Sequence, residues 1–416
     1  MAWAFAKLQL RDAPLLDASA SAAVQQIAQF IPSDLASIAW AFAKCGVSNF
    51  PLMSAIASRA SAMITEFTSR NLANTVWAFA ALECYVAPLI TVSSAQVLRT
   101  ISDFGCQSLS NTAWAYARFG VVDFPLLNAI SASAILSIIE FDIQNLSNTA
   151  WAFATVLLED VPLMESISAS ALKKMNQFDP RALANLAWSC ARVLYAHSPL
   201  LEAIASAAMP RCADFEPQGI GNMAWSFAKM ECHNLPLLDA ISAAAIARSF
   251  QIDPQGLTNT VWAFAVMNVF SAPLLAAISA SSIAKSTAFC PQNLSNLAWA
   301  LARLKMTDDT LMAAIASAAL HKLAEFAPQN LSNTAWSFAT LALLDEPLMA
   351  AIASQALFRL PVASCQDLAN MAWSFATLRI ENWPLLDAIS SESLARINEL
   401  ATQNLASMAW SFSWFT

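Results

Sequence analysis

Glycine and charged residues are both scarce in this sequence of 416 residues. It holds only 6 glycines, and Asp, Glu, Lys and Arg together make up 12% of it, against 57% hydrophobic residues. With so little glycine and weak strand signals, the sequence does not read as a β fold. No stretch reaches the roughly 18 uninterrupted apolar residues that a membrane-spanning helix needs. The apolar content therefore indicates helices that pack on both sides.

Residues that carry metal or catalytic chemistry are also few and scattered. The eight cysteines include no Cys-x-x-Cys, and the three histidines occupy unrelated places in the sequence. The neighbours Cys232 and His233 are an isolated pair, and Gly219-Ile-Gly221 lacks the remainder of a dinucleotide fingerprint. We therefore expect no catalytic site, no metal and no cofactor, and we expect that the protein is not an enzyme. The scattered cysteines predict free, mostly buried thiols in a reducing compartment.

Tryptophan, by contrast, recurs every 37 residues along the chain. The series has no insertion or deletion and consists of Trp3, Trp40, Trp77, Trp114, Trp151, Trp188, Trp225, Trp262, Trp299, Trp336, Trp373 and Trp410. A period of this size is typical of a repeat array in which each unit packs only on its neighbours. We count positions within the repeat from this Trp, which is position 0.

Each repeat predicts two helices. Helix A is expected from about position −5 to +6, after an N-cap at −6 that is Asn, Asp, Ser or Gly in most repeats. Helix B is expected from about +10 to +27, because Asp or Asn at +9 and Pro at +11 form a typical helix start. We therefore predict an all-α protein, an α-solenoid of about eleven 37-residue helical hairpins, which forms a single array over residues 1–416. Both ends of the sequence fall inside a repeat, so we expect a fragment of a longer protein.

The polar residues of helix A follow a regular pattern. On a helical wheel, positions −5, −2, −1, +2, +3 and +5 share an apolar side, and −3, +1 and +4 share the opposite side. Position +4 is basic in half of the repeats: Lys7, Lys44, Arg118, Arg192, Lys229 and Arg303. Position −3 is asparagine in nine: Asn74, Asn111, Asn148, Asn185, Asn222, Asn259, Asn296, Asn333 and Asn370.

Acidic residues are absent from positions −5 to +5 of every repeat. The net charge of −8 and the pI of about 4.9 argue on their face against a nucleic-acid partner. The acids, however, lie in helix B and in the loops, so the polar strip of helix A is weakly cationic. Because solvation alone would not require this exclusion, we interpret the +4 cations as functional.

Three further rows of side chains leave alternatives open. We interpret the Trp series as core, although its place beside +4 would let it stack on a base or an Arg plane. The Asn row would either bond neighbouring backbone and stabilise the stack, or contact phosphate or base edges. A second basic row at +23 is interpreted as structural, because cations favour helix C-termini and Asp214, Glu325 and Glu399 lie three residues further on. That row comprises Lys174, Arg211, Arg248, Lys285, Lys322, Arg359 and Arg396.

The repeat also resembles known families. Asn-Leu-Ser-Asn-Thr-Ala-Trp-Ser-Phe-Ala at 330–339 and Pro-Leu-Leu-x-Ala-Ile at the start of helix B resemble the octotricopeptide and heptatricopeptide repeat proteins. They are also similar to the helical repeats of FAST-kinase-like proteins and of an RNA-editing substrate-binding complex subunit. This resemblance implies an RNA-binding factor of mitochondria or plastids that presents helix A to RNA. Such a factor would act in RNA processing, stability or translation.

We therefore expect the Asn row and the +4 cations to bind single-stranded RNA, organellar transcripts or rRNA, with weak sequence specificity. Specificity should be weak because positions −3 and +1 hardly vary between repeats. Protein partners are also expected, but no membrane and no small-molecule ligand. The alternative is a protein–protein interaction scaffold whose groove holds a peptide or a partner helix.

Overall fold

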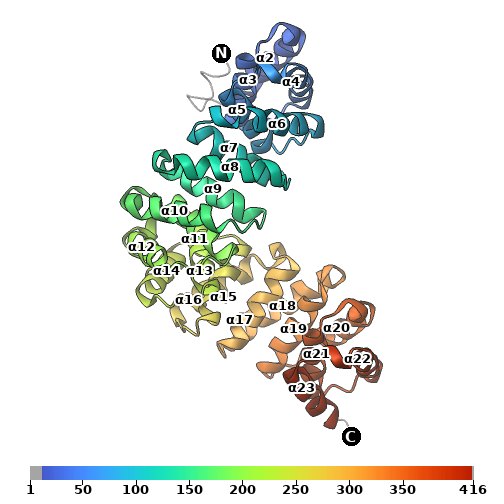
Figure 1. The fold of residues 1–416 in the computed structure, drawn as a ribbon. Helices are drawn as coiled ribbons and strands as arrows, with labels where there is room; N and C mark the ends of the chain where they lie inside the picture. The colour runs from blue at the N-terminus through green and yellow to red at the C-terminus, as the bar shows by residue number, and fades with distance from the viewer. Residues whose placement is uncertain (1–11, 415–416) are drawn as a thin grey trace. The chain divides into compact units, whose positions relative to one another are not determined.

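The computed structural model describes residues 12–414, and in this part of the chain it contains 22 α-helices and no strand. The prediction of an all-α solenoid is confirmed, since consecutive helices pack on one another in repeat after repeat (Figure 1). Trp3 and Lys7 lie outside the described residues. The A helices are α3 (Pro32–Cys45), α5 (Ser69–Ala81), α7 (Cys106–Arg118), α9 (Ile143–Thr155), α11 (Pro180–Arg192), α13 (Pro217–Lys229), α15 (Pro254–Val266), α17 (Pro291–Arg303), α19 (Pro328–Thr340), α21 (Cys365–Thr377) and α23 (Thr402–Ser413).

The B helices alternate with them. They are α2 (Ala13–Gln26), α4 (Phe50–Ala62), α6 (Ala87–Thr100), α8 (Phe124–Ser137), α10 (Val161–Lys174), α12 (Ser198–Ala208), α14 (Leu235–Arg248), α16 (Ala272–Ala284), α18 (Asp309–Lys322), α20 (Glu346–Arg359) and α22 (Trp383–Ala395). All but α14 are followed by a 3-10 turn: η1 (Ile27–Gln29), η2 (Ile64–Glu66), η3 (Ile101–Asp103), η4 (Ile138–Glu140), η5 (Met175–Gln177), η6 (Met209–Asp214), η7 (Ser286–Ala288), η8 (Leu323–Glu325), η9 (Leu360–Val362) and η10 (Ile397–Glu399).

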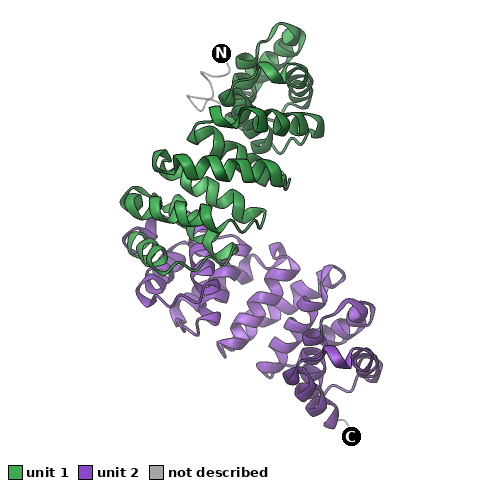
Figure 2. Ribbon diagram, in the orientation of Figure 1, with its two compact units in different colours: residues 1–208 green, residues 209–416 purple. Residues whose placement is uncertain are grey.

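The chain divides into two compact units, residues 1–208 and residues 209–416 (Figure 2). Within each unit the A helices form one layer and the B helices a second layer. Each helix A contacts the next one closely along its length, for example α7 and α9 in the first unit or α13 and α15 in the second. Neighbouring B helices contact one another less, so the A layer is the tighter of the two.

Helix A begins three residues earlier than the sequence pattern predicts. It starts at position −8, and the N-cap is at −9, where Thr68, Asp142, Asp179 and Asp253 accept a hydrogen bond from the backbone N–H three residues later. The expectation of an N-cap at −6 is therefore wrong. The −6 residue sits in the first turn instead, where Asp34, Asn330 and Asp367 bond back to the N–H of the N-cap residue.

Helix A ends between +3 and +5, earlier than the predicted +6, and the residue at +6 is left-handed after each A helix from α3 to α21. Its φ lies between 53° and 67°, and only Gly46 and Gly120 among the ten residues are glycines. The turn is held by two backbone bonds, as in Glu83 N–H to Ala80 C=O and Cys84 N–H to Phe79 C=O. These two hydrogen bonds allow residues other than glycine, such as Glu83 and Arg379, to adopt a backbone conformation that favours glycine.

Helix B confirms its predicted start. Asp12, Asn49, Asp123, Asp160, Asn234 and Asp345 at +9 each accept a hydrogen bond from the backbone N–H at +12. The end differs from the prediction, because the α-helix stops at about +22 or +23 and the chain then forms the 3-10 turn. The +27 residue, usually Phe, follows that turn and is buried in the core, as Phe141 and Phe326 show.

The A layer is tight because the positions where neighbouring A helices meet carry small residues. Position −4 is Ala, Ser, Thr or Gly in every described repeat. At these contacts the Ser110 hydroxyl donates to Asn145 Oδ1 at 2.9 Å, and Ser332 donates to Asp367 Oδ1 at 2.6 Å. The backbones of α13 and α15 approach so closely that a Cβ on Gly221 would lie 2.9 Å from the Gly256 Cα. The A–A interface therefore depends on small side chains and on polar bonds between repeats.

The eight cysteines are free, as expected, but only Cys45, Cys190 and Cys212 are buried, so the expectation of mostly buried thiols is wrong. Burial raises the pKa of the Cys190 thiol to about 12 and that of Cys212 to about 11. These core thiols stay protonated near neutral pH and offer no nucleophile.

The basic row at +23 is structural. Six of its seven cations reach across to the preceding repeat and donate to backbone carbonyls of the turn that follows its helix B. Lys174 donates to Ile139 and Phe141, and Arg248 to Ala213 and Phe215, at 2.5–2.9 Å. Equivalent contacts recur in each of the next repeats, where the donors are Lys285, Lys322, Arg359 and Arg396. These carbonyls have no partner inside their own helix, so the cations satisfy them and join one repeat to the next.

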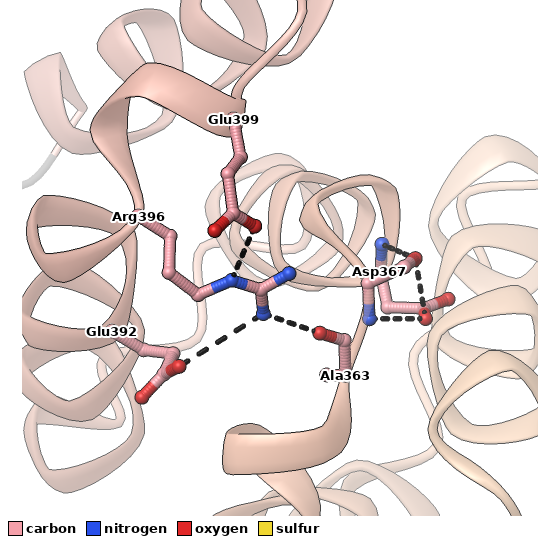
Figure 3. Close-up of polar contacts among 6 residues, drawn as sticks. Ala363, Asp367, Glu392, Arg396 and Glu399 are labelled. Atoms are coloured by element: carbon pink, nitrogen blue, oxygen red, sulfur yellow. Dashed lines mark hydrogen bonds and ion pairs between the residues drawn. The ribbon is translucent and has the colours of Figure 1, made fainter.

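The ion pair expected three residues further on is present for Arg396 but not for Lys322. Arg396 bonds Glu399 at 3.0 Å, and Glu392 lies 3.9 Å from the same guanidinium (Figure 3). These carboxylates, with the Glu399 hydrogen bond as the largest cause, raise the pKa of Arg396. The row therefore acts through backbone carbonyls of the neighbouring repeat more than through its own acids.

Replacing Lys285 with Met should lower the free energy of unfolding by about 1–2 kcal/mol, because two carbonyls lose a charged donor at a half-buried site. Affinity for any nucleic acid should stay the same, since the ammonium is bound to protein. Chemical denaturation with Lys173→Met as the exposed matched control measures the difference. Equal stability of the two variants would contradict the structural role.

Candidate nucleic-acid interface

One face of helix A remains uncovered by other helices in both units. Positions −7, −3, 0 and +4 lie on it, and they follow one another at intervals of four, three and four residues, which places them on a single helical stripe. The −7 residues are exposed in every described repeat, the −3 residues are half-buried in all but the first, and the +4 residues are exposed or half-buried in all of them. We call this stripe the A face. Of the residues that the structure describes, no Asp or Glu occupies these four positions.

Position +1 does not belong to the A face, so the helical-wheel expectation for it is wrong. The residues at +1, all of them Ala or Ser, are buried in every described repeat. Their hydroxyls are satisfied internally: Ser189 donates to the Asn185 carbonyl at 2.7 Å and Ser337 to the Asn333 carbonyl at 2.6 Å. Neighbouring A helices cover this side of the helix.

The Trp series lies on the A face and is not core, contrary to the expectation. None of the described members is fully buried, and Trp410 is 41% exposed. Their indoles contact one another from repeat to repeat. Trp77, Trp114, Trp151 and Trp188 form one row with ring centroids 6.1–6.3 Å apart, and Trp336, Trp373 and Trp410 form another at 6.4 Å. Half-buried stacked indoles present part of an aromatic surface to solvent.

The Asn row at −3 does not stabilise the stack. In the described residues the side-chain amides of Asn74, Asn111, Asn148, Asn185, Asn222, Asn259, Asn296 and Asn333 make no hydrogen bond, and Asn370 accepts one from Gln366 at 2.7 Å. Of the two alternatives that the sequence leaves open, bonding to neighbouring backbone is therefore excluded for this row. The amides face solvent with donor and acceptor capacity unused.

The five +4 cations within the described residues are all exposed, but their surroundings differ. The Lys44 ammonium lies 5.0 Å from the Trp77 ring centroid and 5.8 Å from that of Trp40, and the Arg303 guanidinium lies 5.5 Å from Trp299. Arg303 also donates to the Ala265 carbonyl at 3.0 Å. Cations held over aromatic rings keep their charge on the surface.

Arg118 is the exception among these cations. It pairs with Glu83, the left-handed residue that ends the preceding helix A. Arg192 and Lys229 have no ion pair or hydrogen bond from their side chains in the described chain. The A face therefore carries four cations at +4 that are not neutralised.

The −7 row is the part of this surface that the sequence analysis misses. It is exposed and consists of Ser33, Arg70, Gln107, Gln144, Arg181, Gln218, Gln255, Gln292, Gln329, Gln366 and Gln403. The signal was present in the sequence, since −7 lies only about 20° from Trp on a helical wheel of 100° per residue. It was missed because the helix was expected to begin at −5.

Comparison with protein-family models shows to which family the chain belongs. Residues 1–235 match the model of the RNA-editing substrate-binding complex 6 protein family. The chain belongs to this family. The resemblance to a subunit of that complex, inferred from the repeat motif, is thereby confirmed. The match covers the A helices from α3 to α13, so it includes all of the first unit.

Other comparisons add little to this family assignment. No curated protein matches the chain. A chain of the full-length AP-3 complex in an intermediate open conformation, itself a homology model, is similar with a TM-score of 0.38 at 9% identity. That similarity covers 98% of this chain and 78% of the other. A likeness at this score says nothing about function.

A second surface of this family member is apolar. The edge where helix A turns into helix B exposes large hydrophobic side chains in nearly every described repeat, at positions +6, +8 and +10. They include Phe50, Tyr85, Phe124, Leu157, Val161 and Leu194 in the first unit, and Leu235, Phe270, Leu344 and Trp383 in the second. We call this the turn edge.

Within residues 12–414 no helix has the length and hydropathy to cross a membrane. The same residues contain no group of three or more His, Cys, Asp or Glu side chains placed to hold a metal ion.

Proposed function

We propose that the A face binds single-stranded RNA in an RNA-editing substrate-binding complex. The observation that carries the proposal is the composition of this face: unneutralised cations, unpaired amides and half-exposed indoles, with no carboxylate among them. A backbone-tracking groove combined with aromatic platforms is the usual arrangement for single-stranded nucleic acid. Membership in a family named for a complex that binds RNA-editing substrates supports it.

Each row of the A face supplies a different interaction. Lys44, Arg192, Lys229 and Arg303 would neutralise phosphates, and Arg70 and Arg181 in the −7 row add two more cations. The indoles would stack bases, which is worth about 1–3 kcal/mol per base. The amides at −3 and −7 would contact base edges. Because the same residues recur in most repeats, the face cannot read a mixed sequence, and binding should be weakly specific among such sequences.

The salt dependence of binding tests the proposal. Each neutralised phosphate on a single strand contributes about −0.7 to the slope of log K against log salt, so the six cations predict a slope of about −4. Fluorescence anisotropy with a labelled single-stranded RNA at a series of salt concentrations measures it. Lack of any binding at low salt would contradict the proposal and would favour the alternative function, a protein–protein interaction scaffold.

We further propose that the protein acts in a mitochondrion or a plastid, in RNA processing, stability or translation, or in ribosome assembly. The proposal rests on the repeat proteins that the sequence resembles, which serve organellar RNA. Imaging of the tagged product of the complete gene tests it. A signal spread through the cytosol with none in either organelle would contradict it.

The turn edge favours a protein partner as a second function of the same chain. Exposed apolar side chains that recur along one edge are typical of a protein-binding surface. Replacing Phe50, Phe124 and Phe270 with Ser should release partner subunits and leave RNA affinity unchanged. Unchanged association in a pull-down from native extract would contradict this role of the edge.

A further inference from the structure

The A face repeats one set of side chains almost without change. Seven of the described A helices carry Gln at −7 together with Asn at −3 and Trp at 0; these are α7, α9, α13, α15, α17, α19 and α21. The two amides of a pair are four residues apart and therefore lie one turn apart on the same stripe. Each of these repeats thus presents an amide pair beside an indole.

The amides of the pairs are available for a ligand. In the described chain, the side chains of Gln107, Gln144, Gln218, Gln255, Gln292 and Gln329 make no hydrogen bond, and all are exposed. The pair in α21 differs, because Gln366 bonds Asn370. An amide that bonded its neighbour in every repeat would be structural, whereas six free pairs keep a donor and an acceptor each.

The chemistry of an amide selects among bases. Its adjacent donor and acceptor fit a base edge that offers an acceptor next to a donor. Adenine offers this on its N6/N7 edge, whereas the corresponding edge of guanine presents two acceptors and suits Arg. Every RNA base offers a donor beside an acceptor on its Watson–Crick edge, but only adenine offers the combination on the N6/N7 edge as well, so both amides of a pair can bind one adenine. A purine also covers more of an indole than a pyrimidine does.

The spacing of the repeats fits one nucleotide for each repeat. The ring centroids of neighbouring indoles lie 6.1–6.4 Å apart within the two Trp rows. That is nearly twice the roughly 3.4 Å rise per nucleotide of a stacked strand. A strand that follows the indoles one to one must therefore be extended, with its bases separated from one another and open to the amides.

We infer that the A face prefers adenine-rich single-stranded RNA, with the Gln–Asn pair of each repeat binding the edge of one adenine that stacks on the indole of that repeat. This inference rests on the proposed RNA binding and names its substrate. Identical pairs in successive repeats select the same base, so the ligand is a run of adenines.

Oligonucleotides of equal length and charge test the inference. Binding of the full chain to 12-mers of adenine, uracil and cytosine is compared by fluorescence anisotropy at one salt concentration, with a mixed-sequence 12-mer as reference. The adenine strand should bind at least about tenfold more tightly than the others. In the variant with Gln255, Gln292 and Gln329 all replaced by Leu, this advantage should fall by about tenfold or more, and affinity for the uracil strand should not change.

A matched control replaces three exposed glutamines elsewhere, Gln26, Gln177 and Gln251, with Leu. It should keep the adenine advantage. Equal affinity for all strands, or a preference for uracil or cytosine, overturns the inference while the proposed RNA binding stands. An adenine advantage that the A-face variant retains also overturns it, because the amides would not be its source. Absence of binding to every strand at low salt overturns the proposed function itself.

Discussion

Binding of single-stranded RNA is expected to weaken by about a thousandfold at 0.1 M salt in a variant with Ser in place of Lys44, Arg118, Arg192, Lys229 and Arg303. Each phosphate contact that is lost removes a counterion-release contribution of about 0.7 logarithmic units per tenfold change in salt, which is about fivefold at 0.1 M. Four such losses multiply to nearly a thousandfold, because Arg118 already pairs with Glu83 and adds no free charge. The slope of log K against log salt should become much shallower at the same time. Fold stability should barely change, because all five side chains are exposed.

A matched pair of double variants separates this site from a general charge effect. Arg192→Ser with Lys229→Ser removes one Arg and one Lys from the A face, and neither side chain has a protein partner in the described chain. Arg99→Ser with Lys173→Ser removes one of each from exposed positions of helix B. The first should cost about 20-fold in affinity and the second should cost little. Equal losses in the two would show that net charge, and not the A face, controls binding.

A Gly221→Val substitution is expected to lower the free energy of unfolding by about 2–3 kcal/mol. A Cβ at this position would lie 2.9 Å from the Gly256 Cα and 3.1 Å from its carbonyl oxygen, so two A helices of the second unit would have to move apart. Overpacking of this kind forces backbone shifts, and here the obstacle is main chain, which cannot rotate away. Valine gains a little helix propensity over glycine, but only by a few tenths of a kcal/mol.

Thermal and denaturant unfolding measured by circular dichroism would show the effect as a lower midpoint. Gly105→Val is the control, because no atom lies within 4 Å of the Cβ that it adds and the residue caps α7 outside the A–A interface. That variant should lose no more than about 1 kcal/mol, the cost of valine at an N-cap. If Gly221→Val were as stable as Gly105→Val, close contact of the A helices would not be what holds this layer together.

The repeat boundaries illustrate which parts of the fold the sequence could predict. The start of helix B was correct, since Asp or Asn at +9 followed by Pro is a local signal that acts within one turn. The predicted start of helix A lies three residues after the observed one. Asn, Asp and Ser at −6 look like caps, but in the structure several of them bond the preceding repeat, as Asn145 does with Ser110. A residue whose partner is 35 positions away in sequence has no local signature.

The candidate site divides in the same way. The exclusion of acids from helix A and the rows at −3 and +4 were visible as composition at fixed positions. The structure places both rows on one stripe, and it adds the indoles, which the sequence analysis assigned to the core, and the −7 glutamines, which it left out. The +23 cations were correctly read as structural, but their partners, the carbonyls of the preceding repeat, became clear only from the packing.

The 37-residue period, the helical character of each half and the distribution of charge along the chain follow from the sequence alone, because they depend on spacing and on residue type. The tertiary structure decided which side of helix A meets solvent. Helix A has three neighbours within its unit, namely a helix B and the A helices before and after it, and together they bury everything except a narrow stripe. Alanine fits both a buried and an open side, so an alanine-rich helix does not show in its sequence where those neighbours lie. Only the packed structure shows that Trp faces outward and that +1 faces inward.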